Sequence, residues 1–235
     1  MRIGIIACDA LKDEIEALTR DTQDVVIREY LDFGYHLDPP RMRQILTEKV
    51  NSLAGKVDLV FLGYAYCQSL KGLPSELTVP TIMLEYEDCI ACLLGPDEYA
   101  RQKHKGKITW FYPGGWAKYG LEGLTQLFKL DSLRNQGYES IYFLKLMFDG
   151  FSRCLFIDTK VGDIALSEAN SRHFANKLGM EHDRTEGTLC NLEEVWSRVR
   201  SKTIELEMLQ EPEILAKNNE HILNDSQSEL SGHLI

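Results

Sequence analysis

Short apolar segments alternate with helix-forming segments along the chain, and this alternation constrains the fold more than any other feature. In the stretch 57–94, Val57–Leu62 and Val79–Leu84 are mostly apolar, and a helix pattern begins after Asp88. Segments without a strict polar–apolar alternation are typical of strands buried on both faces of a parallel sheet. Strands that alternate with helices predict an α/β fold, with a mostly parallel sheet and helices on both of its faces.

The other elements follow from the same patterns together with capping residues. Asp9, Asp38 and Asp88 each precede a helix pattern and are placed to cap it, and Gly179 is placed to end one. The run 140–147 is too short and too evenly apolar for periodicity to decide between strand and helix. The predicted strands are Arg2–Ala7, Val25–Tyr30, Val57–Leu62, Val79–Leu84, Lys107–Tyr112, Cys154–Asp158 and Met180–Thr185; the predicted helices start after Asp9 and at Pro39-Pro40, and cover Cys89–Gln102, Tyr119–Leu130, Ser132–Gln136, Asp163–Leu178 and Asn191–Met208.

Length and charge predict one main domain followed by an acidic tail. We expect a single α/β domain over 1–204, which could divide into halves at 1–104 and 105–204, because 235 residues allow an ample core. Residues 205–235 carry seven acidic side chains against one lysine, so this tail, predicted to be flexible, holds −6 of the net charge of −10. The sequence contains no basic stripe, so we do not expect the protein to bind nucleic acid. The sequence has no apolar run long enough to span a bilayer and no signal-peptide pattern. We therefore expect a cytoplasmic protein.

Three cysteines stand where the predicted strands end. Cys8 ends the first strand, Cys67 follows the turn after the third, and Cys89 begins a helix; His36 lies in a loop after the second strand. The carboxyl ends of parallel strands meet at one edge of a sheet, so these four side chains are expected to converge there. Three thiols and one imidazole form a ligand set for zinc, and thiolates also suit iron or an iron–sulfur cluster.

Each of these residues also has a purely structural interpretation. Free cysteine is among the most buried residue types, and Cys92, Cys154 and Cys190 are interpreted as structural on that ground. His36 could cap a turn or pair with Asp38 instead of binding a metal. For Cys89 the dipole of the helix that it begins predicts a depressed pKa.

Several strings together resemble the domain-of-unknown-function family 1638, which occurs in archaea and anaerobic bacteria, including methanogens. These strings are IIACDALKDEI, FGYHLDPPRMRQIL, LGYAYCQSLKGL, EDCIACLLGPDEY and ITWFYPGGW, and their order covers most of residues 1–200. By position, the resemblance points to Cys8, His36, Cys67, Asp88, Cys89 and Trp116. The chain departs from the family pattern in two places: Glu87 stands where a His is common, and Gln68 and Ser69 replace glycines.

Acidic and aromatic residues surround the predicted cysteine edge. Asp9, Glu87 and Asp88 could orient a ligating histidine or bind substrate, although helix capping also explains the two aspartates. Trp116 could line a pocket for a flat or apolar ligand together with Tyr64, Tyr66 and Tyr112, or these rings could simply pack in an aromatic cluster.

Three functional hypotheses remain open from the sequence. The first is a metal-binding protein in which Cys8, Cys67, Cys89 and His36 hold zinc or iron; the resemblance adds a role in anaerobic metabolism, assisting a corrinoid methyltransferase as protein partner. The second is a metal-free acid–base enzyme in which two thiols move a proton, as in racemases of the aspartate/glutamate type. The third is a non-catalytic accessory protein that docks through its acidic tail. No G-x-G-x-x-G or P-loop motif is present, so no nucleotide cofactor is predicted.

Overall fold

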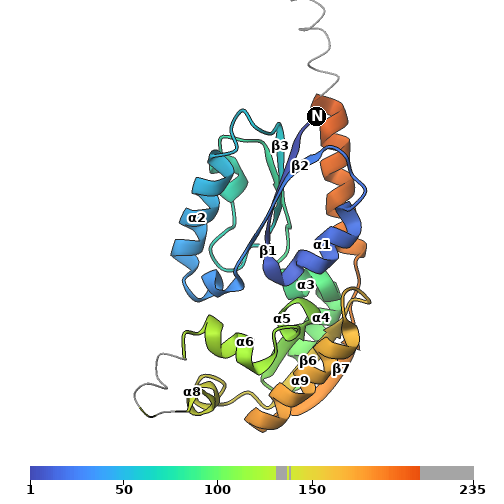
Figure 1. Ribbon diagram of the computed structural model, residues 1–235. Helices are drawn as coiled ribbons and strands as arrows, with labels where there is room; N and C mark the ends of the chain where they lie inside the picture. The colour runs from blue at the N-terminus through green and yellow to red at the C-terminus, as the bar shows by residue number, and fades with distance from the viewer. Residues whose placement is uncertain (131–136, 138, 207–235) are drawn as a thin grey trace, which may run out of the picture.

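The computed structural model describes residues 1–130, 137 and 139–206. Its strands form two parallel sheets, each surrounded by helices, so the molecule has two lobes (Figure 1). The predicted α/β class is confirmed, with the strands divided between two sheets. Among the described residues, no helix combines the length and the apolar character that crossing a bilayer requires. The predicted helix Ser132–Gln136 and nearly all of the predicted tail lie outside the described residues, and the predicted domain boundaries stay a prediction.

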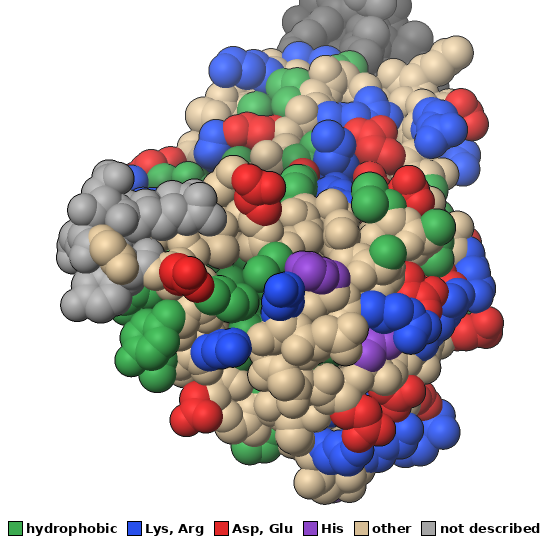
Figure 2. Space-filling model, turned by 60° about the horizontal axis from the view of Figure 1, so that its bottom comes forward, with side chains coloured by type: hydrophobic (Ala, Val, Ile, Leu, Met, Phe, Trp, Pro, Cys, Tyr) green, Lys and Arg blue, Asp and Glu red, His purple; other side chains and the backbone are tan. Residues whose placement is uncertain are grey.

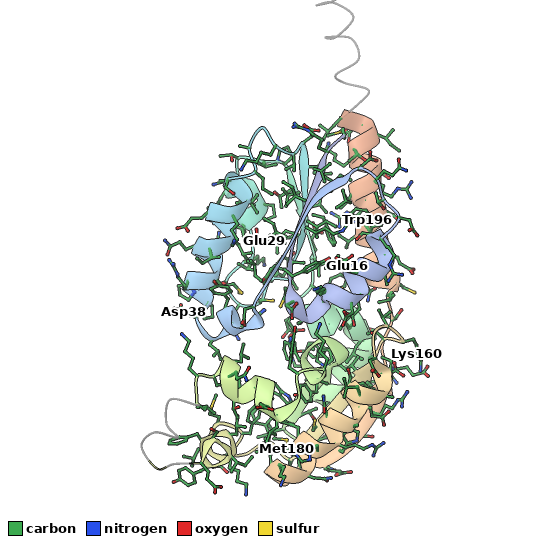
Figure 3. All side chains as sticks on the ribbon, viewed as in Figure 1. Glu16, Glu29, Asp38, Lys160, Met180 and Trp196 are labelled. Carbon is green, nitrogen blue, oxygen red and sulfur yellow. The ribbon has the colours of Figure 1, made fainter. Side chains whose placement is uncertain are left out.

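The first lobe is built on a four-stranded sheet with β1 and β3 at its centre. Every residue of β1 is buried, because the sheet is covered on both faces. Figure 1 shows α2 on one face, and α1 together with the helix over 190–206 on the other. On that last helix Trp196 packs against Phe61 of β3, with ring centroids 5.6 Å apart (Figure 3). The strand order is β2-β1-β3-β4, with β1 at Ile3–Cys8, β2 at Val25–Leu31, β3 at Leu59–Gly63 and β4 at Thr81–Met83; α1 spans Lys12–Thr19 and α2 Pro39–Asn51.

The second lobe is built on a three-stranded parallel sheet in the order β5-β6-β7. The apolar run 140–147, which the sequence left undecided, is helical as α8. Helix α9 ends at Gly179, whose φ of 76° is the left-handed conformation that glycine adopts readily. Figure 2 shows a face of this lobe on which Lys and Arg side chains lie beside Asp and Glu side chains. The buried Asp158 carboxylate pairs with Lys160 and Arg184. The bounds are β5 Thr109–Pro113, β6 Arg153–Asp158, β7 Glu181–Glu186, α5 Gly114–Ala117, α6 Gly120–Leu127, α8 Ser140–Met147 and α9 Ile164–Leu178.

Two of the three predicted caps form, and one prediction is wrong. The Asp38 carboxylate accepts from the backbone N–H of Arg41 at 3.1 Å, and Asp88 caps its helix in the same way. Asp9 caps nothing: it begins the 3-10 helix η1 (Asp9–Leu11), and neither η1 nor α1 has a side-chain cap. Its carboxylate is used differently, as described below.

The predicted helix Cys89–Gln102 is two helices, α3 (Cys89–Leu94) and α4 (Pro96–Lys103). Gly95 separates them with a φ of 80° and a ψ of 148°. A proline lacks the N–H that would continue the helix, and it disfavours the helical conformation in the residue before it. The Gly95-Pro96 pair therefore ends α3 and starts α4.

The two lobes meet at the carboxyl edge of the first sheet. A Cβ atom added to Gly115 of α5 would lie 2.0 Å from the carbonyl oxygen of Ala10, so only glycine allows the lobes to approach this closely. Nearby, the Thr159 hydroxyl donates to the Glu14 carboxylate at 2.8 Å. The end of β1, where Cys8 lies, is therefore held against the second lobe.

Candidate thiol–imidazole site

Cys8 and His36 are in direct contact at the carboxyl edge of the first sheet. The Cys8 Sγ atom lies 3.5 Å from His36 Nε2, within hydrogen-bonding distance for sulfur. His36 is carried by the 3-10 helix η2 (Phe33–Leu37), whose first turn is capped by the Asp32 carboxylate accepting from Gly34 N–H. The imidazole also stacks on Tyr64, with ring centroids 5.9 Å apart. His36 therefore interacts with the thiol edge, while Asp38 caps α2.

Cys67 lies in a turn whose backbone is strained. Its φ is 41° and that of Gln68 is 67°, both in the left-handed region that costs a residue other than glycine about 1–2 kcal/mol. The Cys67 N–H donates to the carbonyl of Glu87 at 3.1 Å, which fixes the turn next to the segment after β4. Conformations of this kind persist where the surrounding structure enforces them and are concentrated at functional sites.

Cys89 is the first residue of α3 and lies beside Cys67. Its backbone N–H is directed at the Cys67 sulfur, where it favours the thiolate. The Asp88 carboxylate is already engaged, because it accepts from Ala91 N–H at 2.8 Å and from the Tyr99 hydroxyl at 2.6 Å. The structure therefore brings Cys8, Cys67, Cys89 and His36 to one edge, with Asp88 as a capping residue.

Burial dominates the electrostatics of this edge. It raises the pKa of the Cys67 thiol to about 12 and raises the pKa values of Cys8 and Cys89 further. Cys67 also raises the pKa of Cys8, and Cys8 and Cys67 raise that of Cys89, since two thiolates would repel each other. Burial lowers the pKa of His36. The edge thus holds neutral thiols and a neutral imidazole at neutral pH. The predicted depressed pKa of Cys89 is wrong, because the desolvation of this thiol outweighs the effect of the helix dipole.

The hydroxyl of Tyr64 is buried and has no hydrogen-bond partner in the described part of the chain. Tyr64 directly follows β3 and is 1% exposed. Its hydroxyl lies close enough to Cys8, Cys67 and Asp32 for their charged forms to raise its pKa, after the larger effect of burial. An unsatisfied buried polar group costs about 1–3 kcal/mol and needs an explanation in a native structure. The sequence pointed to Tyr64 only as an aromatic residue that could line a pocket, and its unpartnered hydroxyl was not predicted.

The other predicted residues lie around this edge in different roles. Glu87 is exposed and pairs with Lys103 at 3.0 Å, so its side chain is used in a surface ion pair. Asp9 accepts a hydrogen bond from the Tyr119 hydroxyl across the two lobes. Trp116 packs on Trp110 at 5.6 Å between ring centroids, as the aromatic-cluster interpretation predicts.

The structure also bears on the other three cysteines and on the predicted metal site. Cys92 and Cys154 are buried, but Cys190 is exposed and is no part of a core. Within the described ranges, no group of three or more His, Cys, Asp or Glu side chains is placed to hold one metal ion. The donors suit zinc chemically, while their arrangement does not form a complete coordination shell.

Two pockets flank the thiol edge. The tryptophan pocket, of about 720 Å³, is lined by Gln68, Asp88, Tyr99, Trp110 and Trp116 among others. The tyrosine pocket, of about 870 Å³, is defined by Asp9, Tyr30, Asp32, Tyr35, Asp38 and Tyr119. Volumes of this size suit small-molecule ligands.

Comparison with known proteins gives a family and a distant structural likeness. No curated protein matches the chain. The crystal structure of glutamate racemase isoform RacE1 from Bacillus anthracis is similar over 89% of this chain and 81% of that one, at 15% identity and a TM-score of 0.35, values that carry no functional information. The sequence profile of the family described as "Protein of unknown function (DUF1638)" matches residues 30–196, so Cys8 precedes the matched region. Because the matched residues make up well over half of the chain, the chain belongs to the DUF1638 family.

Proposed function

We propose that the protein is an enzyme in which Cys8 and His36 act together as an acid–base pair on a small-molecule substrate. The observation that carries the proposal is the 3.5 Å contact between Cys8 Sγ and His36 Nε2. A thiol in contact with a neutral imidazole has a base at hand to take its proton, and such pairs activate cysteines in enzymes. The neutral imidazole of His36 can accept this proton, which an imidazolium could not, and substrate binding must offset the burial that raises the pKa of Cys8.

The proposed chemistry is proton transfer at a substrate carbon. His36 Nε2 accepts the Cys8 proton, and the resulting thiolate is stabilised by the Ala10 N–H directed at the sulfur. The thiolate then removes a proton from the substrate carbon, and the neutral Cys67 thiol, which lies near Cys8, supplies a proton in return. The Cys67 thiolate left behind is stabilised by the N–H of Cys89. A general base must lie within hydrogen-bonding reach of its partner, and the Cys8–His36 contact meets that condition.

Solvent exchange tests the proposal without knowledge of the natural substrate. The full chain is incubated in heavy water with a panel of amino acids, hydroxy acids and keto acids, and replacement of carbon-bound hydrogen by deuterium is followed by NMR. We expect exchange in at least one compound, with a rate reduced at least about 100-fold in Cys8→Ala and in His36→Gln.

Cys190→Ala is the matched control, because Cys190 is an exposed thiol outside the site. It should exchange at the rate of the unmodified protein. Exchange that persists unchanged in Cys8→Ala, or its absence across the whole panel, would contradict the proposal.

A metal-binding role is the second candidate, and the proximity of the three thiols favours it. Cys67 raises the pKa of Cys8, both raise that of Cys89, and with His36 the three thiols offer the donors that zinc and iron prefer. A cation would remove the repulsion between thiolates. Because no described set of three donors is placed to hold one ion, these side chains would have to move closer together.

Metal analysis of protein purified without oxygen tests this second candidate. Close to one zinc or iron per chain, lost in Cys67→Ser, would establish a metal site and displace the acid–base proposal. A stoichiometry near zero in both proteins would end it. A metal-bound thiolate can accept a methyl group, which is the chemistry that a corrinoid methyltransferase partner would require, and that role depends on this outcome.

A further inference from the structure

The tyrosine pocket beside the Cys8–His36 pair has a distinct chemical character. Among the described residues, the carboxylates of Asp9, Asp32 and Asp38 line it against one ammonium group, that of Lys129. We propose that this pocket binds a small molecule through a positively charged ammonium group, which rests on the proposed function and names its substrate class.

The three pocket carboxylates form no ion pair with a described lysine or arginine, although Lys129 lines the pocket. Each carboxylate uses one oxygen for a hydrogen bond: Asp9 from Tyr119, Asp32 from Gly34 N–H and Asp38 from Arg41 N–H. A second oxygen on each is left to accept from a ligand, and charge-assisted hydrogen bonds of that kind are the strong ones.

The pocket walls are aromatic and have affinity for cations. Tyr30, Tyr35 and Tyr119 all line the pocket. Two of these rings already attract a lysine of the protein, with Lys12 Nζ 5.4 Å from the Tyr30 centroid and Lys118 Nζ 5.1 Å from that of Tyr119. Ring faces attract ammonium groups electrostatically, and Tyr35 has no such lysine over it in the described residues.

The pocket is connected to the thiol edge through Tyr64. Its unpartnered hydroxyl, on a side chain that is 1% exposed, is influenced by the charges of Asp32 in the pocket and of Cys8, and its ring stacks on His36 at 5.9 Å between centroids. A ligand held by the carboxylates would bring a hydrogen-bonding group within reach of this hydroxyl. The same ligand would then present its carbon atoms towards Cys8 and His36.

Binding of 1,4-diaminobutane to the full chain tests the proposal by isothermal titration calorimetry. The neutral 1,4-butanediol and the anionic succinate have the same number of carbon atoms and serve as ligand controls. Asp9→Asn and Asp32→Asn keep the acceptor oxygens for Tyr119 and Gly34 but remove the negative charge. We expect each substitution to raise the diamine Kd about tenfold, as for the loss of one hydrogen bond to a charged group.

Asp97→Asn is the matched control, since Asp97 is exposed on α4 away from the pocket. Binding of the diamine that weakens in Asp9→Asn and Asp32→Asn, but not in Asp97→Asn, supports the proposal. Absence of diamine binding, equal binding of succinate, or equal affinities in all variants would overturn it. Diamine binding that survives in Cys8→Ala but without any Cys8-dependent exchange would leave the pocket assigned and refute the acid–base role alone.

Discussion

The turn at Cys67 and Gln68 gives the sharpest prediction about how the site is built. Gln68 is exposed, so a change there removes little packing, but its φ of 67° is a conformation in which glycine is unstrained. Replacing it by glycine should recover the cost of the left-handed backbone, about 1–2 kcal/mol. Glycine also gives the unfolded chain more freedom, which offsets about 0.4–1 kcal/mol of that gain. We expect Gln68→Gly to raise the free energy of unfolding by about 0.5–1 kcal/mol, obtained as the difference of the two terms.

Urea unfolding of Gln68→Gly and Lys71→Gly measures this effect. Lys71 is also exposed in the same loop but lacks a positive φ, so its replacement by glycine brings only the entropic loss. The two variants should differ by about 1–2 kcal/mol in the free energy of unfolding, with unchanged m-values. Equal effects of the two substitutions would refute the assignment of strain to this turn, and with it the argument that the fold enforces the position of Cys67.

Three further predictions address burial, charge and the contact between the lobes. Iodoacetamide should label one thiol per chain in the native protein, that of Cys190, because the other five are buried, and it should label all six in denaturant. The labelled thiols are counted by mass spectrometry. Two or more native thiols labelled at similar rates would contradict the described edge. Burial raises the pKa of Glu14 above its ordinary value of 4.5, so its contribution to stability is present below pH 4.5 and lost as pH rises through the folded pKa. Glu14→Gln should therefore stabilise the protein by about 1 kcal/mol at neutral pH in urea titrations, with no gain below pH 4.5. Gly115→Ala should lower the free energy of unfolding by about 1–3 kcal/mol, because its Cβ meets the Ala10 backbone. Gly114→Ala in the same helix has no atom near its Cβ and should leave the free energy of unfolding almost unchanged. Similar unfolding curves for the two variants would show that the lobes part easily.

The fold could be predicted where one local signal acted alone. The central strands β1 and β3 are continuous apolar runs, and β2, β6 and α9 begin and end within one residue of their predicted bounds. Asp38 and Asp88 were recognised as caps because each is followed by a helix pattern with free N–H groups at its start. The break at Gly95-Pro96 was missed because the apolar spacing continues across it.

Chain topology was enough to predict which residues lie at the site, but not their ionisation or their contacts with the second lobe. Parallel strands place Cys8, Cys67 and Cys89 at one edge, and that convergence follows from the sequence. The direction of the pKa shift of Cys89 did not follow from the sequence, since it depends on how deeply the thiol is buried and not on the helix it begins. Asp9 looked like a cap, but its partner Tyr119 lies 110 residues away, in a lobe whose packing no local pattern reveals.

The two lobes contribute unequally to the proposed site. Cys8, His36 and Cys67 come from the first lobe, on β1, η2 and the turn after β3, and so do the pocket carboxylates of Asp9, Asp32 and Asp38. The second lobe contributes Tyr119 to the tyrosine pocket and Trp116 to the tryptophan pocket. A change in how the lobes pack would therefore alter the pockets first and leave the Cys8–His36 contact in place. Substrate affinity should depend on the Gly115 contact between the lobes, whereas the acid–base pair should depend on the first sheet alone.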